Sequence, residues 1–161
     1  MELLVRPSTA ADIAAVDALL ARAYPKLLKH DYAPSVLVTA LPLISRAQPA
    51  LLTCGTYYVA EGDGAILGAG GWTRDRSLKE LGHIRHVVTD DRAVRRGVGR
   101  AILSHILIQA GAAGITELEC WSTFTAEPFY AAMGFRSEGP MEVALQPGIS
   151  FPAIRMRQSL S

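Results

Sequence analysis

Cysteine and net charge are both scarce in this sequence. The two cysteines, Cys54 and Cys120, are too few for a disulfide framework, and no Cys-x-x-Cys pair suggests a zinc site. The formal net charge of +1 favours neither a nucleic-acid partner nor an anionic membrane. The first residues lack the charged and apolar regions of a signal peptide, and no apolar run approaches the roughly 18 residues of a membrane span. We therefore expect a cytoplasmic protein with no nucleic-acid or membrane partner.

Repeats, low-complexity tracts and linkers are also missing. The chain has 161 residues, half of them hydrophobic, which fits one globular domain over residues 1–161. The sequence contains no Gly-x-Ser-x-Gly elbow, so a serine hydrolase has no support. His83 and His86 do not form a metal pair, because side chains three residues apart on a strand point to opposite faces. We predict no metal site.

Hydrophobic periodicity predicts an alternation of strands and helices. We expect a first helix that Ser8 or Thr9 caps and that stops before Pro25, and then an irregular connection over residues 26–32. Gly62-Asp63-Gly64 predicts a hairpin, and the glycine-rich strand after it leaves one face open to close contact with a neighbour. Strands are expected over 3–6, 56–61, 65–73, 81–89, 115–121, 135–145 and 153–160, and further helices over about 34–46, 98–110 and 126–133.

The order of these elements predicts the fold class. The strand, helix and strand between residues 81 and 121 form a unit whose two strands should be parallel, whereas the hairpin and the two last strands should be antiparallel. We therefore predict an α/β (α+β) domain. Its mixed, mostly antiparallel sheet should have about six or seven strands and about four helices.

The stretch Arg95-Arg96-Gly97-Val98-Gly99-Arg100 is the strongest local signal. It lies between a predicted strand and a predicted helix, where first-turn N–H groups have no partner and the helix dipole favours negative charge. Glycine lets the backbone approach an anion closely. A P-loop would need Lys and then Ser or Thr after the last glycine, and the third glycine of the dinucleotide fingerprint is replaced by Ile102. A phosphate-bearing ligand is therefore favoured, but the loop alone does not say which.

Two motifs together resemble the GNAT superfamily of acetyl-coenzyme A-dependent N-acyltransferases. The first, residues 95–103, is similar to the family's Q/R-x-x-G-x-G/A loop and its helix. The second, Ala126-Glu127-Pro128-Phe129-Tyr130-Ala131-Ala132-Met133-Gly134-Phe135, is similar to the family's A-x-x-F-Y-x-x-x-G-F segment. Their order and spacing, with a strand before each, make the resemblance specific.

The resemblance implies acetyl-coenzyme A as acyl donor, bound without a metal. Two central parallel strands would splay apart to admit its pantetheine arm, which would pair with a strand edge, while its pyrophosphate would meet the glycine loop. Cys120 and Trp121 should then lie near the acyl end. The implied contacts are Val87, Val88, Thr89, Arg95, Arg96, Gly97, Val98, Gly99, Arg100, Thr125 and Phe129.

The resemblance also implies roles in the chemistry. Tyr130 matches the tyrosine that protonates the departing thiolate, and the N–H of Val87 would hold the developing oxyanion. His83 falls where several family members carry a glutamate that deprotonates the amine, directly or through water. His86, Glu80 or water alone stay open as alternatives for the base.

We therefore predict an enzyme that transfers an acetyl group to a primary amine on a small molecule, peptide or protein. A homodimer stays open as its assembly. The sequence does not identify the acceptor. The near-neutral charge of the chain argues against a strongly acidic or polycationic acceptor. The alternative is a non-catalytic module that binds acyl-coenzyme A as a sensor. Candidates for lining the acceptor site are Tyr24, Tyr32, Trp72, Arg74 and Arg85.

Overall fold

A computed structural model describes residues 2–160. Its strands are β1 (Leu4–Pro7), β2 (Tyr57–Gly62), β3 (Ala65–Arg74), β4 (Leu81–Thr89), β5 (Glu117–Ser122), β6 (Arg136–Gln146) and β7 (Ile149–Ser159). Its helices are α1 (Ile13–Leu28), α2 (Pro34–Ile44), α3 (Pro49–Leu52), α4 (Val98–Ala112) and α5 (Glu127–Ala132), with a 3-10 turn over Ala10–Asp12.

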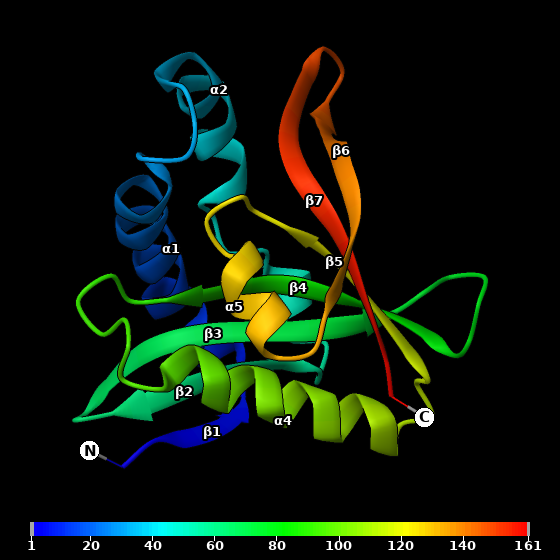
Figure 1. Ribbon diagram of the computed structural model, residues 1–161. Coiled ribbons are helices and arrows are strands. Elements are labelled where there is room, and N and C mark those ends of the chain that lie inside the picture. Colours follow the sequence, from blue (N-terminus) through cyan, green and yellow to red (C-terminus); the bar gives the residue numbers. More distant parts are fainter. Residues whose placement is uncertain (1, 161) are drawn as a thin grey trace.

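The strands form one seven-stranded sheet in the order β1-β2-β3-β4-β5-β7-β6 (Figure 1). Neighbouring strands pair antiparallel except for β4 and β5, which are parallel and joined through α4. The predicted mixed α/β fold with a central parallel pair is confirmed. The parallel pair places the ends of β4 and β5 at the same edge of the sheet, where the glycine loop and α5 follow them.

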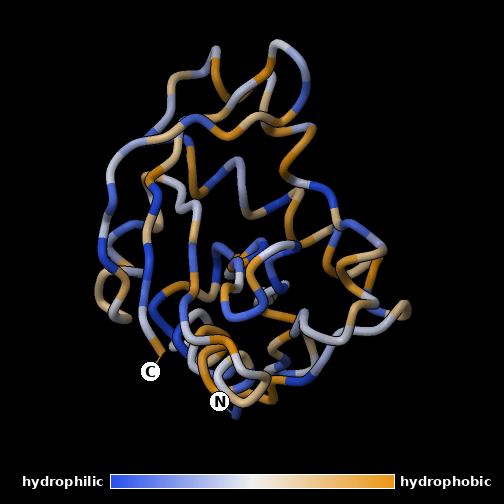
Figure 2. Tube along the Cα trace, turned by 90° about the vertical axis from the view of Figure 1, so that its right-hand side faces the viewer, coloured by the Kyte–Doolittle hydropathy of each residue, from blue (hydrophilic) through white to orange (hydrophobic). Residues whose placement is uncertain are grey.

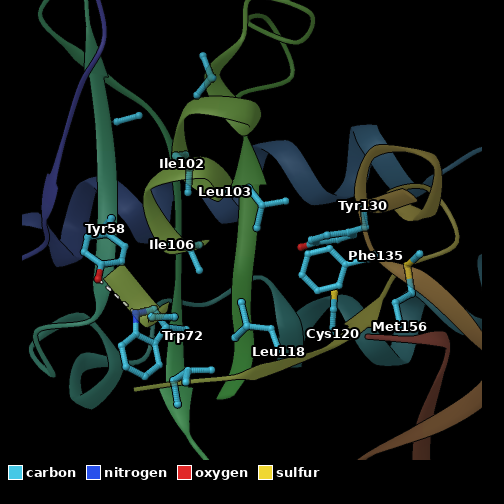
Figure 3. Close-up of a cluster of buried hydrophobic side chains, with 14 of the residues drawn as sticks. Tyr58, Trp72, Ile102, Leu103, Ile106, Leu118, Cys120, Tyr130, Phe135 and Met156 are labelled. Carbon is cyan, nitrogen blue, oxygen red and sulfur yellow. Dashed lines mark hydrogen bonds between the residues drawn. The ribbon is translucent and has the colours of Figure 1, made fainter. Parts of the chain in front are cut away.

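Helices cover both faces of the sheet. On one face α4 buries Ile102, Leu103 and Ile106 in a cluster that includes Leu118 of β5 and Tyr130 of α5 (Figure 3). On the other face α1 packs its apolar side on β2, β3 and β4, and α2 packs on the β6–β7 hairpin. Hydrophobic and hydrophilic stretches alternate along most of the trace (Figure 2), as expected of elements that bury one side each.

β4 and β5 separate after a short paired segment. They pair only from Leu81 to His83 of β4 and from Glu117 to Glu119 of β5. β4 continues to Thr89 and β5 to Ser122, but the two strands no longer bond to each other there. The splay leaves backbone groups on the facing edges of both strands without a sheet partner on that side, so an extended amide-containing ligand can pair with them.

A β-bulge in β4 accompanies the splay. Gly71 pairs with Arg85 and Ala69 with Val88, so Gly70 faces both His86 and Val87. His86 has the positive φ of 42° that such an irregularity imposes. A side chain at Gly70 has no room here, because its Cβ would lie 2.7 Å from Val87 Cγ2 and 3.1 Å from Ile102 Cγ2.

Gly70→Ala should therefore destabilise the protein. The added methyl must push Val87 or α4 away, and overpacking of this kind costs about 2 kcal/mol, or roughly 5 °C in melting temperature. Gly111→Ala is the matched control: Gly111 is exposed within α4 and its Cβ would meet nothing within 4 Å. It should stabilise by about 0.5–1 kcal/mol. Thermal unfolding of both variants measures this, and an unchanged melting temperature for Gly70→Ala would contradict the packing described.

Some boundaries differ from the prediction. α1 runs through Pro25 to Leu28, so neither the stop before Pro25 nor the irregular connection from residue 26 was right. The last turn carries Leu28, which is 1% exposed, and its packing on α2 and β7 outweighs the cost of a proline inside a helix. α4 likewise continues past Gly111 to Ala112, and Gly114, with φ of 92°, follows its end. The short helix α3 was not predicted.

Candidate active site

A cavity of about 1170 Å³ occupies the splay between β4 and β5. One end is formed by the glycine loop and the start of α4, and the middle by the bulged part of β4, the end of β5 and α5. The other end lies between α1, α2 and the β6–β7 hairpin. The cavity therefore joins a helix start with unbonded amides to an apolar chamber, past an exposed strand edge.

The glycine loop presents backbone amides and cations together. Gly97 precedes α4 in the left-handed conformation, with φ of 82°, and no side chain caps the first turn of the helix. The N–H groups at the start of α4 are therefore free to bind an anion. Arg95, Arg96 and Arg100 are exposed, and none of them forms an ion pair within the described residues.

Gly99 brings the loop close to its neighbours. A Cβ at this position would lie 3.2 Å from Thr89 Oγ1 and 3.3 Å from the ring of Phe129. The end of β4, the first turn of α4 and α5 thus converge on one backbone position. Such a cradle fits a pyrophosphate, which needs amide donors and close backbone approach.

Most of the predicted cofactor contacts line this cavity. Arg96 does not, although its neighbours do. Thr125 lines the cavity and donates a hydrogen bond from Oγ1 to Asp31 Oδ2 at 2.7 Å. Cys120 and Trp121 are also at its wall. The predicted contacts on the wall are Val87, Val88, Thr89, Arg95, Gly97, Val98, Gly99, Arg100, Thr125 and Phe129.

Tyr130 lies at the cavity wall and is 4% exposed. Its ring makes edge contacts with Phe129 and with Phe135, the latter visible in Figure 3. Burial, followed by the nearby Cys120 thiol that hydrogen-bonds to it, raises the pKa of Tyr130 well above its usual value. The hydroxyl is therefore protonated at every physiological pH, which a proton donor requires.

Cys120 is a buried thiol rather than a nucleophile. It is 2% exposed, and burial raises its pKa to about 12. The thiolate that would attack an acyl group is therefore not populated at neutral pH.

His83 belongs to a polar cluster on the face of the sheet that carries α1. Its Nε2 lies 2.8 Å from Asp75 Oδ1, and its Nδ1 lies 3.6 Å from Glu119 Oε1. The hydrogen bond from His83, with those from the amides of Leu78 and Ser77, lowers the pKa of Asp75 to about 2. Asp75 is thus ionised and can accept a hydrogen bond from Nε2. In the tautomer that carries its proton on Nε2, the lone pair of the ring is on Nδ1.

The structure places the two histidines differently. His83 does not line the large cavity but a small hollow of about 80 Å³, formed with Ile84, Arg85, Glu119 and Trp121. The hollow adjoins the large cavity, because Ile84, Arg85 and Trp121 line both. His86 lines the large cavity itself, and burial followed by the charge of Arg85 lowers its pKa, so it is neutral at pH 7.

Sequence reasoning missed the acidic partners of this cluster. Asp75 lies between two predicted strands and Glu119 within a third, and neither is among the predicted site residues. Glu119 is 7% exposed and accepts hydrogen bonds from Trp121 Nε1 at 2.8 Å and from Arg157 at 3.0 Å. A charged residue at an inward position of a strand was the only available signal, and its partner is 38 residues away.

The candidates for the acceptor site separate into two groups. Tyr24 and Arg85 line the large cavity. The others do not: Tyr32 bonds to the Pro152 carbonyl, Trp72 to Tyr58, and Arg74 to the carbonyls of Lys79 and Ala113. These three side chains bind neighbouring parts of the fold through hydrogen bonds and do not reach the cavity. Glu80, an alternative base, is also outside both hollows.

Two further properties bear on the kind of site. Within residues 2–160, no three or more His, Cys, Asp or Glu side chains are grouped to hold a metal ion. None of the helices in that range is long and apolar enough to cross a membrane.

Solved structures with a similar architecture include acetyltransferases. The chain is similar in structure to a GCN5-related N-acetyltransferase from Rhodopseudomonas palustris, with a TM-score of 0.84 and 20% identity over 99% of this chain and 96% of the other. It is also similar to the PaiA N-acetyltransferase of Thermoplasma acidophilum in complex with coenzyme A. The TM-score is 0.75, with 11% identity over 99% of this chain and 99% of the other. A third similar structure is that of YncA from Salmonella typhimurium with acetyl-CoA. The TM-score is 0.72, with 17% identity over 100% of this chain and 95% of the other.

These likenesses, all below 25% identity, establish the fold, and no curated protein matches the chain in sequence. The family assignment comes from the sequence itself. Residues 48–157 match the acetyltransferase (GNAT) domain, which is more than half of the chain. The chain therefore belongs to the GNAT acetyltransferase family.

Proposed function

We propose that the protein transfers an acetyl group from acetyl-coenzyme A to a primary amine. The observation that carries this proposal is the splay of β4 from β5, which opens a cavity from the glycine loop to Tyr130. Coenzyme A has a pyrophosphate for the loop amides and an extended amide arm for the edge of β4. Coenzyme A in PaiA and acetyl-CoA in YncA support the same ligand here.

The residues at the wall supply the binding. The amides from Gly97 to Arg100, at the start of α4, hold the pyrophosphate, with Arg95 and Arg100 adding attraction from the surface. Val87, Val88 and Thr89 offer the strand edge to the pantetheine arm. Phe129 and Thr125 close the cavity on the side of α5.

The chemical step needs a free amine, a stabilised oxyanion and a proton for the thiolate. The amine nitrogen forms a bond to the acetyl carbon as the carbon–sulfur bond breaks. The backbone N–H of Val87, at the bulge, stabilises the charge on the thioester oxygen. Tyr130 gives its proton to the departing sulfur, and its raised pKa keeps that proton available.

His83 is the base in this proposal. Asp75 orients its ring and leaves the Nδ1 lone pair to accept a proton, which is the arrangement of an activated base with an orienting carboxylate. The small hollow that His83 lines opens beside Arg85 and Trp121, next to the acyl end of the cavity. The buried neutral His86 is the alternative.

His83→Gln should lower kcat/KM about 100-fold, the usual contribution of a general base. Asp75→Asn should lower it less, because the ring stays but loses its orientation. His86→Gln is the comparison variant. Steady-state assays of thiol release from pH 5.5 to 9 measure all three. Asp75, with a pKa of about 2, stays ionised over this range and contributes no limb to the profile.

A larger loss in His86→Gln than in His83→Gln would transfer the role to His86. Burial lowers the pKa of His86. As the base, it would therefore stay unprotonated, and the enzyme active, to a pH below the usual pKa of histidine.

The activity itself is tested by thiol release from acetyl-CoA over a panel of primary amines. We expect acetyl-CoA to raise the melting temperature and at least one amine to give acetylated product by mass spectrometry. Acetyl-CoA that neither stabilises the protein nor supports any transfer would refute the proposed function.

A further inference from the structure

Arg85 lies at the junction of the large cavity and the small hollow. Its Nε donates a hydrogen bond to Thr73 Oγ1 at 2.8 Å, which leaves the two terminal nitrogens of the guanidinium available. Among the described residues, no Asp or Glu forms an ion pair with it. A partly buried arginine without an acidic partner is costly unless a ligand supplies the anion.

The environment of Arg85 makes that cost larger. Burial, followed by the positive charge of Arg76, lowers the pKa of Arg85, although a guanidinium remains charged at neutral pH. The side chain is therefore held, charged and partly dehydrated, where a bound anion would be stabilised by a two-pronged contact.

The other charges near the cavity are already accounted for. Arg95 and Arg100 line the far end, beside the glycine loop. No Asp or Glu of residues 2–160 lines the large cavity. The acid of the small hollow, Glu119, uses Oε1 for Trp121 and Oε2 for Arg157. A polycationic amine thus finds no free carboxylate at this site, whereas an anionic group finds Arg85.

The chamber beyond the acyl end is apolar. α1, α2 and the β6–β7 hairpin all contribute to it, and its polar side chains are few. Two of the residues on its wall, Leu28 and Phe151, are buried in the cluster that joins α2 to β7. The aliphatic and aromatic side chains on this wall are Leu27, Leu28, Leu43, Ile44, Val143, Leu145 and Phe151.

We propose that the acceptor is a free amino acid with an apolar side chain, whose carboxylate binds Arg85; this proposal rests on the proposed acyl transfer. His83 and Arg85 are two residues apart on β4 and point to the same face. An amine one carbon away from a carboxylate can therefore reach the base while the carboxylate contacts the guanidinium. The apolar side chain then enters the chamber between α1, α2 and the β6–β7 hairpin. A protein N-terminus has an amide in place of that carboxylate and does not satisfy Arg85.

The test compares acceptors that differ only in the carboxylate. Leucine, leucinamide and 3-methylbutylamine share the apolar group, and glutamate and spermidine probe charge. We expect kcat/KM for leucine or phenylalanine to exceed that for the matching amide and decarboxylated amine about tenfold or more, as a charge-assisted contact gives. The amine of leucinamide is less basic than that of leucine, so more of it is unprotonated at neutral pH. If Arg85 bound no carboxylate, leucinamide should therefore react at least as well as leucine.

Variants of Arg85 separate binding from chemistry. Arg85→Met should raise KM for leucine about tenfold or more while kcat changes less and KM for 3-methylbutylamine stays the same. Arg85→Lys should restore part of the loss. Arg136→Met, at an exposed arginine of β6 outside both hollows, is the control. Calorimetry should give all variants the acetyl-CoA affinity of the wild type.

The outcomes distinguish this proposal from the proposed function. Amides or simple amines that react as well as amino acids would overturn the carboxylate site while acyl transfer stands. Acetyl-CoA binding with no amino acid accepted would overturn it as well. Absence of acetyl-CoA binding would overturn the proposed function first.

Discussion

Tyr130→Phe should lower kcat about 100-fold and leave the affinity for acetyl-CoA within about twofold of the wild type. The substitution removes only the hydroxyl that protonates the departing thiolate. The ring, which makes edge contacts with Phe129 and Phe135, stays in place. Thiol release measures kcat, and calorimetry measures the dissociation constant.

The raised pKa of Tyr130 also predicts how kcat depends on pH. A phenol whose pKa lies well above its usual value keeps its proton through pH 9, so wild-type kcat should show no fall from loss of that proton between pH 7 and 9. Tyr58→Phe is the matched control, because Tyr58 is 3% exposed and its hydroxyl bonds to Trp72 outside the cavity. It should retain kcat. A Tyr130→Phe enzyme with wild-type kcat would remove Tyr130 from the mechanism.

Gly99→Val should abolish most binding of acetyl-CoA. A Cβ at this position would lie 3.2 Å from Thr89 Oγ1, and the two further methyl groups of valine have no space beside Phe129. They would fill the cradle where the pyrophosphate approaches the amides. Loss of two or more hydrogen bonds to a charged group weakens binding about 100-fold or more. Calorimetry with acetyl-CoA measures the loss, and thermal unfolding shows whether the variant remains folded.

Arg95→Ala separates the backbone from the arginine side chains. Arg95 is exposed, and exposed charges contribute up to about 1 kcal/mol, so its loss should weaken binding about fivefold or less. The affinity of this variant should also depend less on salt. If Arg95→Ala cost more affinity than Gly99→Val in a folded protein, side chains rather than amides would bind the pyrophosphate.

Much of the architecture was predictable because local signals agree with it. The hairpin at Gly62-Asp63-Gly64, the strand before Gly97 and the helix after it each follow from turn chemistry and periodicity within a few residues. The order of the two motifs then fixed the family. Pro25 misled the prediction, because the burial of the turn after it depends on α2 and β7, which no local pattern near Pro25 reveals.

The candidate site was less predictable than the fold. The glycine loop and Tyr130 carry recognisable motifs, and both lie at the cavity wall. The partners of His83 come from a loop before β4 and from β5, so only the folded sheet brings Asp75 and Glu119 beside it. Arg85 has the same limitation. An arginine on a strand is unremarkable in sequence, and its meaning depends on whether the fold places an acidic side chain beside it.

Direct binding of nucleotide ligands tests the assignment of the cavity most simply. Acetyl-CoA, ATP and NAD share a pyrophosphate or polyphosphate, but of the three only acetyl-CoA has the amide-containing arm that fits the edge of β4. Calorimetry at one salt concentration should give a dissociation constant for acetyl-CoA at least about tenfold lower than for either nucleotide. Equal or tighter binding of ATP or NAD would contradict an acetyl-coenzyme A site in the splay of β4 and β5.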